Sequence, residues 1–460
     1  MKPTHSKYLF YLASFTFIVL IIFSYVFFLE RSMLLDLPFH LFTILAKDDY
    51  TIQNYRYIAL LTESVPLLLS KFDISLKTIT ICYSMSFALL YFLVFLFIYK
   101  VMRNEKIAIA FFLYNIVMYT HTFYWPVTEL HQGIAFLFIL IALLENICIS
   151  DSELTIIQYF SILGLIIIIS FAHPLLIFSG LFSIAFLLLN YKSKYKFLLS
   201  IAILITIGFL AKNILLATSH DNSSMSGIKN IITYFPHYKG LQSNKNLLKY
   251  ILHDYYFIPI LYLLITYYYF KQKNILKFSL LTLSLIAYTF IVNITYPNGA
   301  DEFYLENQYM QVGLFISLAF VYEIYHHEKI TLFISILFSL ISILGLYRIY
   351  STNKIYEARN HWYRKTIEQV AYKKIIFPGN KIPMDTVIMT WAASYEFWLI
   401  STIEKNNTSS INIEEYEGEY DTSLYLKNAL IVKRKDFNYN KLNPTYFILK
   451  DTSTSYTKIK

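Results

Sequence analysis

Residues 8–29 read YLFYLASFTFIVLIIFSYVFFL, an apolar run without a single charged side chain. A helix needs about 20 such residues to cross a hydrocarbon core about 30 Å thick. Since lipid offers no partner for backbone N–H and C=O groups, a run of this length must be helical. No small-residue cleavage site follows it, so we interpret it as a membrane helix rather than a cleaved signal peptide.

Similar apolar runs recur to about residue 350. Together they predict an α-helical polytopic membrane protein with about 11 spans, near residues 8–29, 76–99, 107–124, 131–147, 155–171, 174–191, 197–217, 250–270, 276–295, 310–326 and 330–350. The chain is 57% hydrophobic and only 15% charged, whereas soluble domains carry about 25% charged residues. Residues 351–460 have a more polar composition. We therefore expect a transmembrane domain, 1–350, followed by a small soluble α/β domain, 351–460.

The net charge of +9 comes largely from basic residues in short clusters between the apolar runs. Such clusters mark cytoplasmic loops, so they indicate topology and not a nucleic-acid partner. With a cytoplasmic N-terminus, the inner segments contain Lys2, Lys7, Lys100, Arg103, Lys106, Lys192, Lys194, Lys196, Lys271, Lys273, Lys277 and Lys329. An odd number of spans then places the C-terminal domain outside the cytoplasm. The abundance of Ile, Lys, Asn and Tyr suggests a low-GC bacterial genome, so we expect the membrane to be a bacterial inner membrane.

Three long outer loops are expected, at 30–75, 218–249 and 296–309. The first should contain short amphipathic helices, such as one over 57–69. Acids and histidines gather on the outer side: Asp36, His40, Asp48, Asp49, Glu129, His131, His173, Asp301, Glu302 and Glu306. Carboxylates held near lipid are costly and frequently mark function, although water-exposed loops also carry charge without one. Asp36 and Glu129 stand out because apolar and aromatic residues surround them, whereas His173 is expected to cap a helix.

This arrangement resembles the GT-C superfamily of membrane glycosyltransferases. The shared features are a cytoplasmic N-terminus, a first helix followed at once by a long acidic outer loop, many further spans and an outer C-terminal domain. Members take sugars from polyprenyl-phosphate carriers and carry an essential Asp or Glu in the first outer loop. By this resemblance the essential acid is Asp36, within Asp36-Leu-Pro-Phe-His40, with Asp48 and Asp49 as fallback acids. Glu129 matches a second acid that recurs in the next outer loop.

The chain also departs from two branches of that superfamily. It lacks the Asp-Glu pair that directly follows the first span of protein mannosyltransferases. It also lacks the Trp-Trp-Asp motif of oligosaccharyltransferases in its tail. The resemblance therefore implies sugar transfer without identifying the sugar or the acceptor.

Transfer from a phosphate-linked donor would give these residues distinct roles. A carboxylate must take the proton of the attacking hydroxyl, and Asp36 is the candidate base, with Glu129 as a second catalytic acid. The leaving phosphate needs positive or hydrogen-bond-donating groups nearby, for which Arg56, His40 and His131 are candidates. A divalent metal, Mg²⁺ or Mn²⁺, held by Asp36 and Glu129 would serve the same purpose.

Three further residues complete the expected substrate-binding set. Trp125 offers a flat surface on which a sugar ring could stack, although an aromatic residue at such a place also serves as an interfacial anchor. Asp301 and Glu302 lie in the last long outer loop. The expected partners are membrane lipid, a polyprenyl-phosphate sugar donor and a glycan, lipid or protein acceptor. Cys82 and Cys148 offer neither a metal-binding spacing nor a disulfide framework.

The tail is predicted to begin with a helix over 351–375. Candidate strands follow at 386–390, 410–413, 429–432 and 446–449, with a helix near 394–404. The tail contains no Gly-rich phosphate loop, no Cys/His metal spacing and no nucleophile elbow. We expect it to support the site or to bind the acceptor, and a structural cap without a ligand is an equal alternative.

Three other functions fit parts of the pattern. A lipid or polysaccharide transporter or flippase would keep polar or broken-helix sites near mid-membrane, but the predicted spans carry few central charges. An outer-leaflet polysaccharide polymerase or ligase would rely on outer-loop arginines, and the predicted outer loops hold only Arg31 and Arg56. A non-catalytic assembly factor also remains compatible with the sequence.

Overall fold

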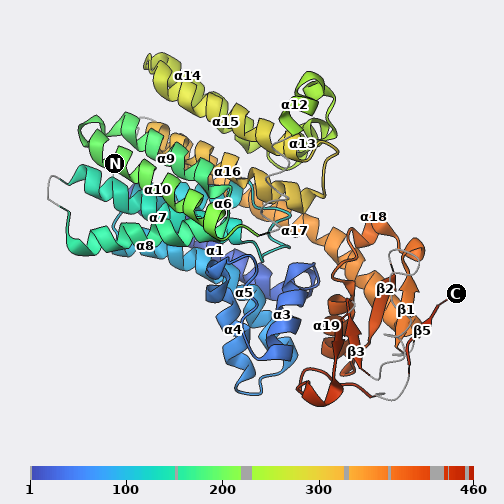
Figure 1. Cartoon of the computed structure of the whole chain (residues 1–460). Helices are drawn as coiled ribbons and strands as arrows, with labels where there is room; N and C mark the ends of the chain where they lie inside the picture. Colours follow the sequence, from blue (N-terminus) through green and yellow to red (C-terminus); the bar gives the residue numbers. More distant parts are fainter. Residues whose placement is uncertain are drawn as a thin grey trace.

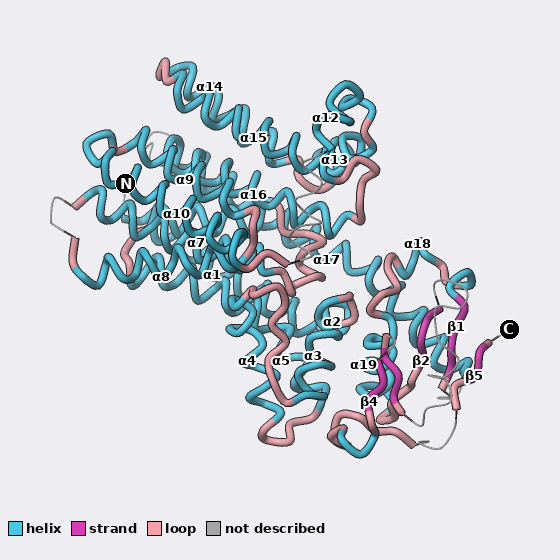
Figure 2. The backbone as a smooth tube through the Cα atoms, viewed as in Figure 1, coloured by secondary structure: helices cyan, strands magenta, loops and turns pink. Residues whose placement is uncertain are grey.

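The computed structural model describes residues 3–150, 154–218, 230–325, 331–370, 374–414, 429–433, 435–450 and 455–459. An elongated body of helices leads at one end into a smaller C-terminal segment, which contains the strands (Figure 1; Figure 2). Helix α17, Thr331–Val370, joins the two parts. The predicted last span and most of the predicted helix over 351–375 therefore belong to one continuous helix, which ends at Val370. Residues 371–373 lie outside the described residues, and Ile375 already belongs to a strand.

The apolar runs form the helical body. Its principal helices are α1 (Pro3–Val26), α5 (Leu76–Leu96), α6 (Glu105–Val117), α7 (Glu129–Ile149), α8 (Ile156–Ala172), α9 (Leu176–Asn190), α10 (Tyr195–Leu215), α14 (Phe257–Lys271), α15 (Ile275–Thr295) and α16 (Glu302–Phe320). Polar side chains cap several of them. Asn104 accepts the N–H of Ile107 at the start of α6, and Thr155 forms a capping box with Gln158 at the start of α8. Such caps satisfy N–H groups that have no partner within the helix.

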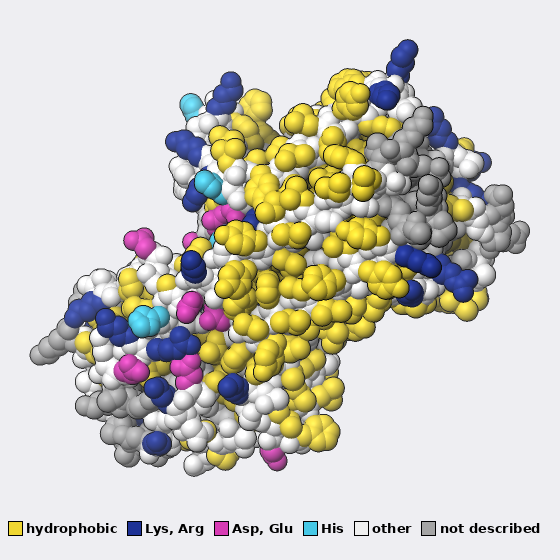
Figure 3. Space-filling model, turned by 180° about the vertical axis from the view of Figure 1, so that it is seen from behind, with side chains coloured by type: hydrophobic (Ala, Val, Ile, Leu, Met, Phe, Trp, Pro, Cys, Tyr) yellow, Lys and Arg dark blue, Asp and Glu magenta, His cyan; other side chains and the backbone are white. Residues whose placement is uncertain are grey.

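Six helices in the described part of the chain are long and apolar enough to cross a membrane: Ser6–Val26, Leu76–Val101, Glu129–Ile149, Lys192–Leu215, Ile275–Thr295 and Thr331–Val370. The number is seven if α13 (Gln242–His253) and α14, which meet at a bend of 85°, form one broken span. Hydrophobic side chains cover a broad band of the helical body (Figure 3). Lys and Arg side chains lie on both sides of this band, mixed with Asp and Glu toward the C-terminal segment and without visible acids at the opposite, basic end. The chain is an α-helical membrane protein.

Helix α6 is shorter than the predicted span over 107–124, because it ends at Val117. The backbone N–H groups of Thr120, His121 and Thr122 instead donate to the carboxylate of Glu306 on α16, over 2.8, 3.0 and 2.8 Å. The Tyr255 hydroxyl donates to the same carboxylate over 2.8 Å. Glu306 is completely buried. A distant acid therefore holds residues 118–128 in a loop where apolar composition alone favours helix.

The first long loop folds into a group of short helices beside α5. These are α2 (Phe28–Ser32), α3 (Asp36–Lys47), η1 (Tyr57–Ala59) and α4 (Leu60–Ser70). The predicted helix over 57–69 is confirmed by η1 and α4 together. After α10, the short helices α12 (Ile231–Tyr234) and η5 (Phe235–Gly240) precede α13.

The C-terminal segment has a small sheet with the strand order β2 (Ile411–Glu414), β1 (Ile375–Pro378) and β5 (Thr457–Lys458), all parallel. Strands β3 (Leu430–Val432) and β4 (Lys435–Phe437) form an antiparallel pair, and helix α19 (Ala393–Lys405) packs against β2. The predicted helix near 394–404 and the strands near 410–413 and 429–432 are confirmed. Strands β1, β4 and β5 were not predicted.

Two predicted strands are wrong. The segment over 386–390 contains the end of the short helix α18 (Met384–Val387) followed by loop, because the N–H groups of Thr386 and Val387 both bond the carbonyl of Pro383 over 2.9 Å. Over 446–449 the chain bends, since the N–H groups of Tyr446 and Phe447 both bond the carbonyl of Asn443 over 3.0 Å. Local bonds have replaced a sheet ladder in both places.

A buried ion pair fastens the C-terminal segment to the first loop. Glu396 on α19 accepts a bond of 2.6 Å from Arg359 on α17, and both side chains are buried. The Tyr363 hydroxyl donates to the same oxygen of Glu396. The other oxygen accepts the backbone N–H of Leu35 over 2.9 Å, and Arg359 also donates to the carbonyl of Met33. This cluster, the Glu396 clamp, therefore contacts the residues immediately before Asp36.

Candidate functional site

A cavity of about 460 Å³ lies between the first loop, the start of α16 and the C-terminal segment. Five residues predicted as site residues line it: Asp36, His40, Arg56, Trp125 and Glu129. They come from segments that are far apart in the chain, namely α3 with its following loop and the residues leading into α7. We call this space the Asp36 cavity.

Asp36 begins helix α3 after an unusual turn. Its neighbour Leu35 has a φ of 54°, a region that residues with a side chain adopt only when their surroundings hold them there. The Glu396 clamp supplies that restraint through the N–H of Leu35. On the cavity side, the indole N–H of Trp125 donates to Oδ2 of Asp36 over 2.7 Å. The position of the carboxylate is therefore fixed from both sides.

The surroundings of Asp36 change its acidity. Burial raises the pKa of Asp36 to about 6, and the nearby negative charge of Glu129 adds to this effect. The charge of His40, the bond from Trp125 and the charge of Arg56 act in the opposite direction. A carboxyl group with a pKa near 6 can both accept and hold a proton near neutral pH, which is the property required of a general base.

Basic side chains stand next to this carboxylate. Arg56 donates to Glu129, the first residue of α7, over 3.1 Å. The His40 ring contacts Glu63 over 2.6 Å, and Glu63 also accepts the N–H of Thr51 over 2.8 Å. Burial lowers the pKa of His40, but the bond and charge of Glu63 outweigh it, so that the pKa is raised overall. The protonated, positively charged form of His40 is thus favoured close to Asp36.

A second and larger space of about 930 Å³ adjoins the Asp36 cavity. The two share Asp36, Gln53 and Trp391 as lining residues. Three lysines line the larger space: Lys47 from the end of α3, and Lys433 and Lys435 from the β3–β4 pair. The ammonium group of Lys433 lies 4.3 Å from the ring centre of Trp391. The larger space can therefore hold an anionic or ring-shaped group next to Asp36.

Some predicted site residues lie elsewhere. His131 is completely buried within α7, where Nε2 contacts Asn115 over 3.0 Å and the ring stacks on Tyr91 at 4.0 Å. It packs among the helices and does not line the Asp36 cavity, so the structure does not bring it together with the other predicted binding residues. His131 lies two residues after Glu129, about 200° further around α7, so its ring faces the neighbouring helices and not the cavity.

The fallback acids are also outside the cavity. Asp48 ends α3 with a left-handed conformation and pairs with Lys71 at the exposed surface. Asp49 accepts the N–H of the next residue, Tyr50, over 2.7 Å and is likewise exposed. Asp301 occupies the N-cap position of α16 and does not line the cavity. Asp48 and Asp49 occupy positions where water can solvate their charge, whereas Asp301 is half-buried and burial raises its pKa.

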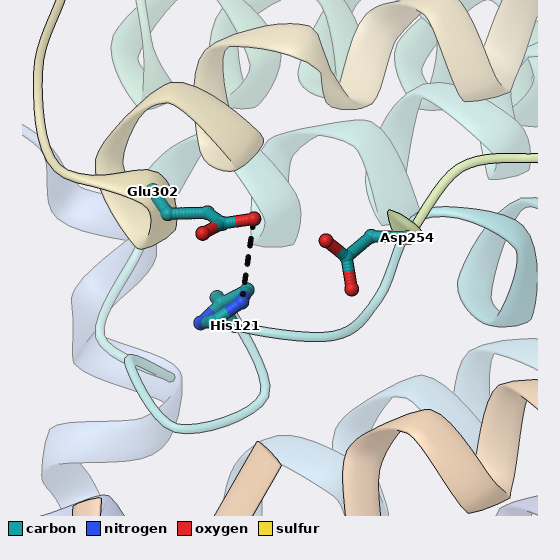
Figure 4. Close-up of side chains that lie close together, drawn as sticks. All are labelled: His121, Asp254 and Glu302. Carbon is teal, nitrogen blue, oxygen red and sulfur yellow. Dashed lines mark ion pairs between the residues drawn. The ribbon is translucent and has the colours of Figure 1, made fainter. Parts of the chain in front are cut away.

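Glu302 belongs to a different cluster, together with His121 and Asp254 (Figure 4). His121 comes from the loop after α6, Asp254 from the bend between α13 and α14, and Glu302 from the start of α16. Burial, followed by the bond and charge of Asp254, raises the pKa of Glu302 to about 8. Burial lowers the pKa of His121 to about 4. The cluster is the one group of three or more such ligand residues whose ligand atoms converge within 4.8 Å in the described part of the chain.

Sequence reasoning missed several lining residues. Asn307 and Gln308 on α16 line the Asp36 cavity, and Thr128 bonds Asn307 over 2.7 Å. The sequence could have indicated these two residues, because amide side chains within an apolar stretch frequently face a polar space. Trp391 gave no such signal, since it lies in a tail segment whose contact with the first loop depends on the tertiary fold. His173 lines the cavity while its Nδ1 accepts the N–H of Leu175 over 3.2 Å at the end of α8.

No family model, curated protein or solved structure matches the chain.

Proposed function

We propose that the chain is a membrane glycosyltransferase that moves a sugar from a polyprenyl-phosphate carrier to a hydroxyl acceptor. The observation that carries the proposal is the Asp36 carboxylate, with its raised pKa, on the wall of a cavity that also holds Arg56, His40 and aromatic rings. Sugar transfer needs a base, a positive environment for phosphate and a surface for the sugar. This cavity offers all three within one space.

In the proposed reaction, Asp36 accepts the proton of the acceptor hydroxyl while the hydroxyl oxygen attacks the anomeric carbon of the sugar. The bond between that carbon and the phosphate oxygen breaks, and the electron pair leaves with the phosphate. The configuration at the anomeric carbon is inverted by this single displacement. The charges of His40 and Arg56 stabilise the negative charge that develops on the phosphate. Trp125 and Trp391 provide ring faces for the sugar.

The contacts of Arg56 argue against a metal ion bound by Asp36 and Glu129. Its guanidinium already bonds Glu129, and Trp125 bonds Asp36. A cation at this pair would have to displace the guanidinium, and no third carboxylate or imidazole joins the two acids in a ligand group among the described residues. The pair therefore does not fit a metal site, and the proposed reaction uses Arg56 and His40 as its positive groups.

An apolar groove supports a lipid-linked donor. The groove has a volume of about 330 Å³ and is lined by residues of α13, α14, α15 and α16, among them Tyr255, Tyr262 and Leu285. Gln308 lines the Asp36 cavity, and the next residue on α16, Tyr309, lines the groove. A polyprenyl chain in this groove would bring its phosphate toward the cavity from the bilayer.

The proposal includes a full topology. Each of the eleven predicted spans overlaps a helix, although α6 ends at Val117 and a bend of 85° interrupts the span over 250–270. We propose that the shorter helices also cross the bilayer as parts of the bundle. The N-terminus would then be cytoplasmic, and the C-terminal α/β segment would lie on the outer face of a bacterial inner membrane. The basic end of the hydrophobic band in Figure 3 supports this direction, because cytoplasmic loops are enriched in Lys and Arg. This topology is the GT-C-like architecture that we propose for the chain.

The pH dependence of transfer tests the role of Asp36. The base must be deprotonated, so kcat/KM should rise with pH through an acid limb centred near pH 6. This is the pKa of the Asp36 carboxyl group in the protein without substrate, which is about 6. Trp125→Phe removes a bond that lowers this pKa, and the limb should therefore move to higher pH. Glu129→Gln removes a negative charge that raises it, and the limb should move to lower pH. Two shifts in the same direction would contradict the assignment.

A further inference from the structure

We infer that His121, Asp254 and Glu302 form a binding site for a divalent transition-metal ion, with Zn²⁺ the best match. One ligand atom from each residue lies within 4.8 Å of the other two (Figure 4). The site is separate from Asp36 and Glu129. It joins three segments of the chain that are widely separated in sequence.

The ligand chemistry favours this class of metal. An imidazole nitrogen with two carboxylate oxygens suits Zn²⁺ and its neighbours, whereas Mg²⁺ and Ca²⁺ prefer oxygen ligands alone. Zinc bonds to nitrogen and oxygen are about 2.0–2.2 Å long, so neighbouring ligand atoms around a tetrahedral ion lie roughly 3.3 Å apart. Nε2 of His121 lies 3.6 Å from Oε1 of Glu302. This pair is close to the required separation, and rotation of the carboxyl groups can close the rest.

A second observation comes from the other side of the imidazole. Nδ1 of His121 contacts the hydroxyl of Tyr356 on α17 over 3.1 Å. This contact orients the ring so that Nε2 points toward the carboxylates. Histidines that bind metals almost always bond a partner through their second nitrogen, which fixes the ring and its tautomer. The backbone of His121 is also held, because its N–H donates to Glu306 over 3.0 Å.

The positions of the three ligands indicate a structural role for the ion. The three ligands belong to the loop that carries Trp125, to the 85° break between α13 and α14, and to the start of α16. Phe303 and Tyr304, which follow Glu302 directly, line the Asp36 cavity. An ion at this site would therefore brace one wall of the cavity. Three protein ligands also leave a coordination position for water, as in zinc sites that are not fully closed.

Metal binding by the purified full-length chain in detergent tests the inference. After removal of metals with a chelator, the chain should take up one Zn²⁺ or Co²⁺ per molecule, and Co²⁺ should give a visible absorption band from its coordination. His121→Asn, Asp254→Asn and Glu302→Gln should each weaken binding at least tenfold. Tyr356→Phe should also weaken binding, by roughly 10–100-fold, because the His121 ring keeps its ligand nitrogen but loses the contact that orients it.

Neighbouring residues provide matched controls. His253→Asn and Asp301→Asn change residues directly beside two ligands but outside the cluster, and both should bind Co²⁺ like the parent chain. Lys249 is close enough for its positive charge to lower the pKa values of both His121 and Glu302. Lys249→Met removes that repulsion for a cation and should tighten binding severalfold. This variant and Tyr356→Phe keep the inference testable if a ligand variant does not fold.

Failure of the parent chain to bind Zn²⁺, Mn²⁺ or Co²⁺ stoichiometrically would overturn the inference. Unchanged affinity in all three ligand variants would do the same, because the ion would then be bound elsewhere. The measurement needs no sugar donor. Its outcome therefore stands apart from that of the proposed transferase activity.

Discussion

Asp36→Asn is expected to lower sugar transfer by about 10²–10⁴-fold, the usual contribution of a positioned general base. The amide has the same shape as the carboxyl group and can still accept the bond from the Trp125 indole, so the cavity should keep its structure. The fold of the chain should not change. The measurement is the rate of transfer from a polyprenyl-phosphate sugar by purified protein, compared at equal amounts of membrane-inserted chain.

The same loop contains the control for this experiment. Asp48→Asn and Asp49→Asn neutralise exposed acids at the end of α3, outside the Asp36 cavity. Both variants should retain transfer close to the parent rate. Parent-like transfer by Asp36→Asn would remove Asp36 from the mechanism, and an equal loss in all three variants would indicate a general effect of charge on the loop.

Glu396→Ala is expected to be the most destabilising of the substitutions considered. It leaves the Arg359 guanidinium buried without its counter-ion, and removal of one partner of a buried pair typically costs about 3–5 kcal/mol. It also removes the acceptor of the Leu35 N–H, which restrains the turn before Asp36. The thermal midpoint in detergent should therefore fall, and transfer should fall with it even at temperatures where the chain stays folded.

The same two helices offer a matched control. Arg364 on α17 bonds Glu404 on α19 over 2.8 and 2.9 Å, but this pair is partly exposed. Glu404→Ala should cost no more than about 1 kcal/mol, since water solvates the remaining charge. The double variant Glu396→Leu with Arg359→Met should recover part of the stability lost in Glu396→Ala. Equal midpoints for Glu396→Ala and Glu404→Ala would show that the Glu396 clamp has no special role.

The helices of the body could be predicted because lipid imposes one backbone solution on a long apolar run. Their ends were harder, because tertiary contacts set them. Helix α6 ends at Val117 because the carboxylate of Glu306 accepts hydrogen bonds from backbone N–H groups that follow it. The sequence near residue 117 gives no sign of this contact, since Glu306 lies far along the chain. In the tail, β2 and β3 could be predicted from short apolar runs, whereas β4 and β5 have two or three residues, include charged side chains and gave no such run. The predicted strand at 386–390 was wrong because hydrogen bonds to the carbonyl of Pro383 form a helical turn there.

The candidate site was predictable in part for a related reason. Asp36 and Glu129 are charged residues beside apolar stretches. Burying such a charge near lipid costs free energy unless polar partners surround it, so these residues indicate a polar site. His131 has the same local signal, yet its ring faces the packed interior of the bundle. The helix period alone does not show which face of α7 adjoins the cavity. The meeting of His121, Asp254 and Glu302 also lay beyond sequence reasoning, since it depends on the bend between α13 and α14.

The most direct test of the proposed function follows the donor itself. Purified chain is placed in vesicles with a labelled polyprenyl-phosphate sugar and a hydroxyl acceptor, and both the release of polyprenyl phosphate and the movement of labelled lipid between leaflets are measured. We expect release of the carrier with formation of a glycosidic product of inverted configuration. Movement of intact donor between leaflets, without cleavage of its sugar–phosphate bond, would contradict the transferase and support a lipid transporter.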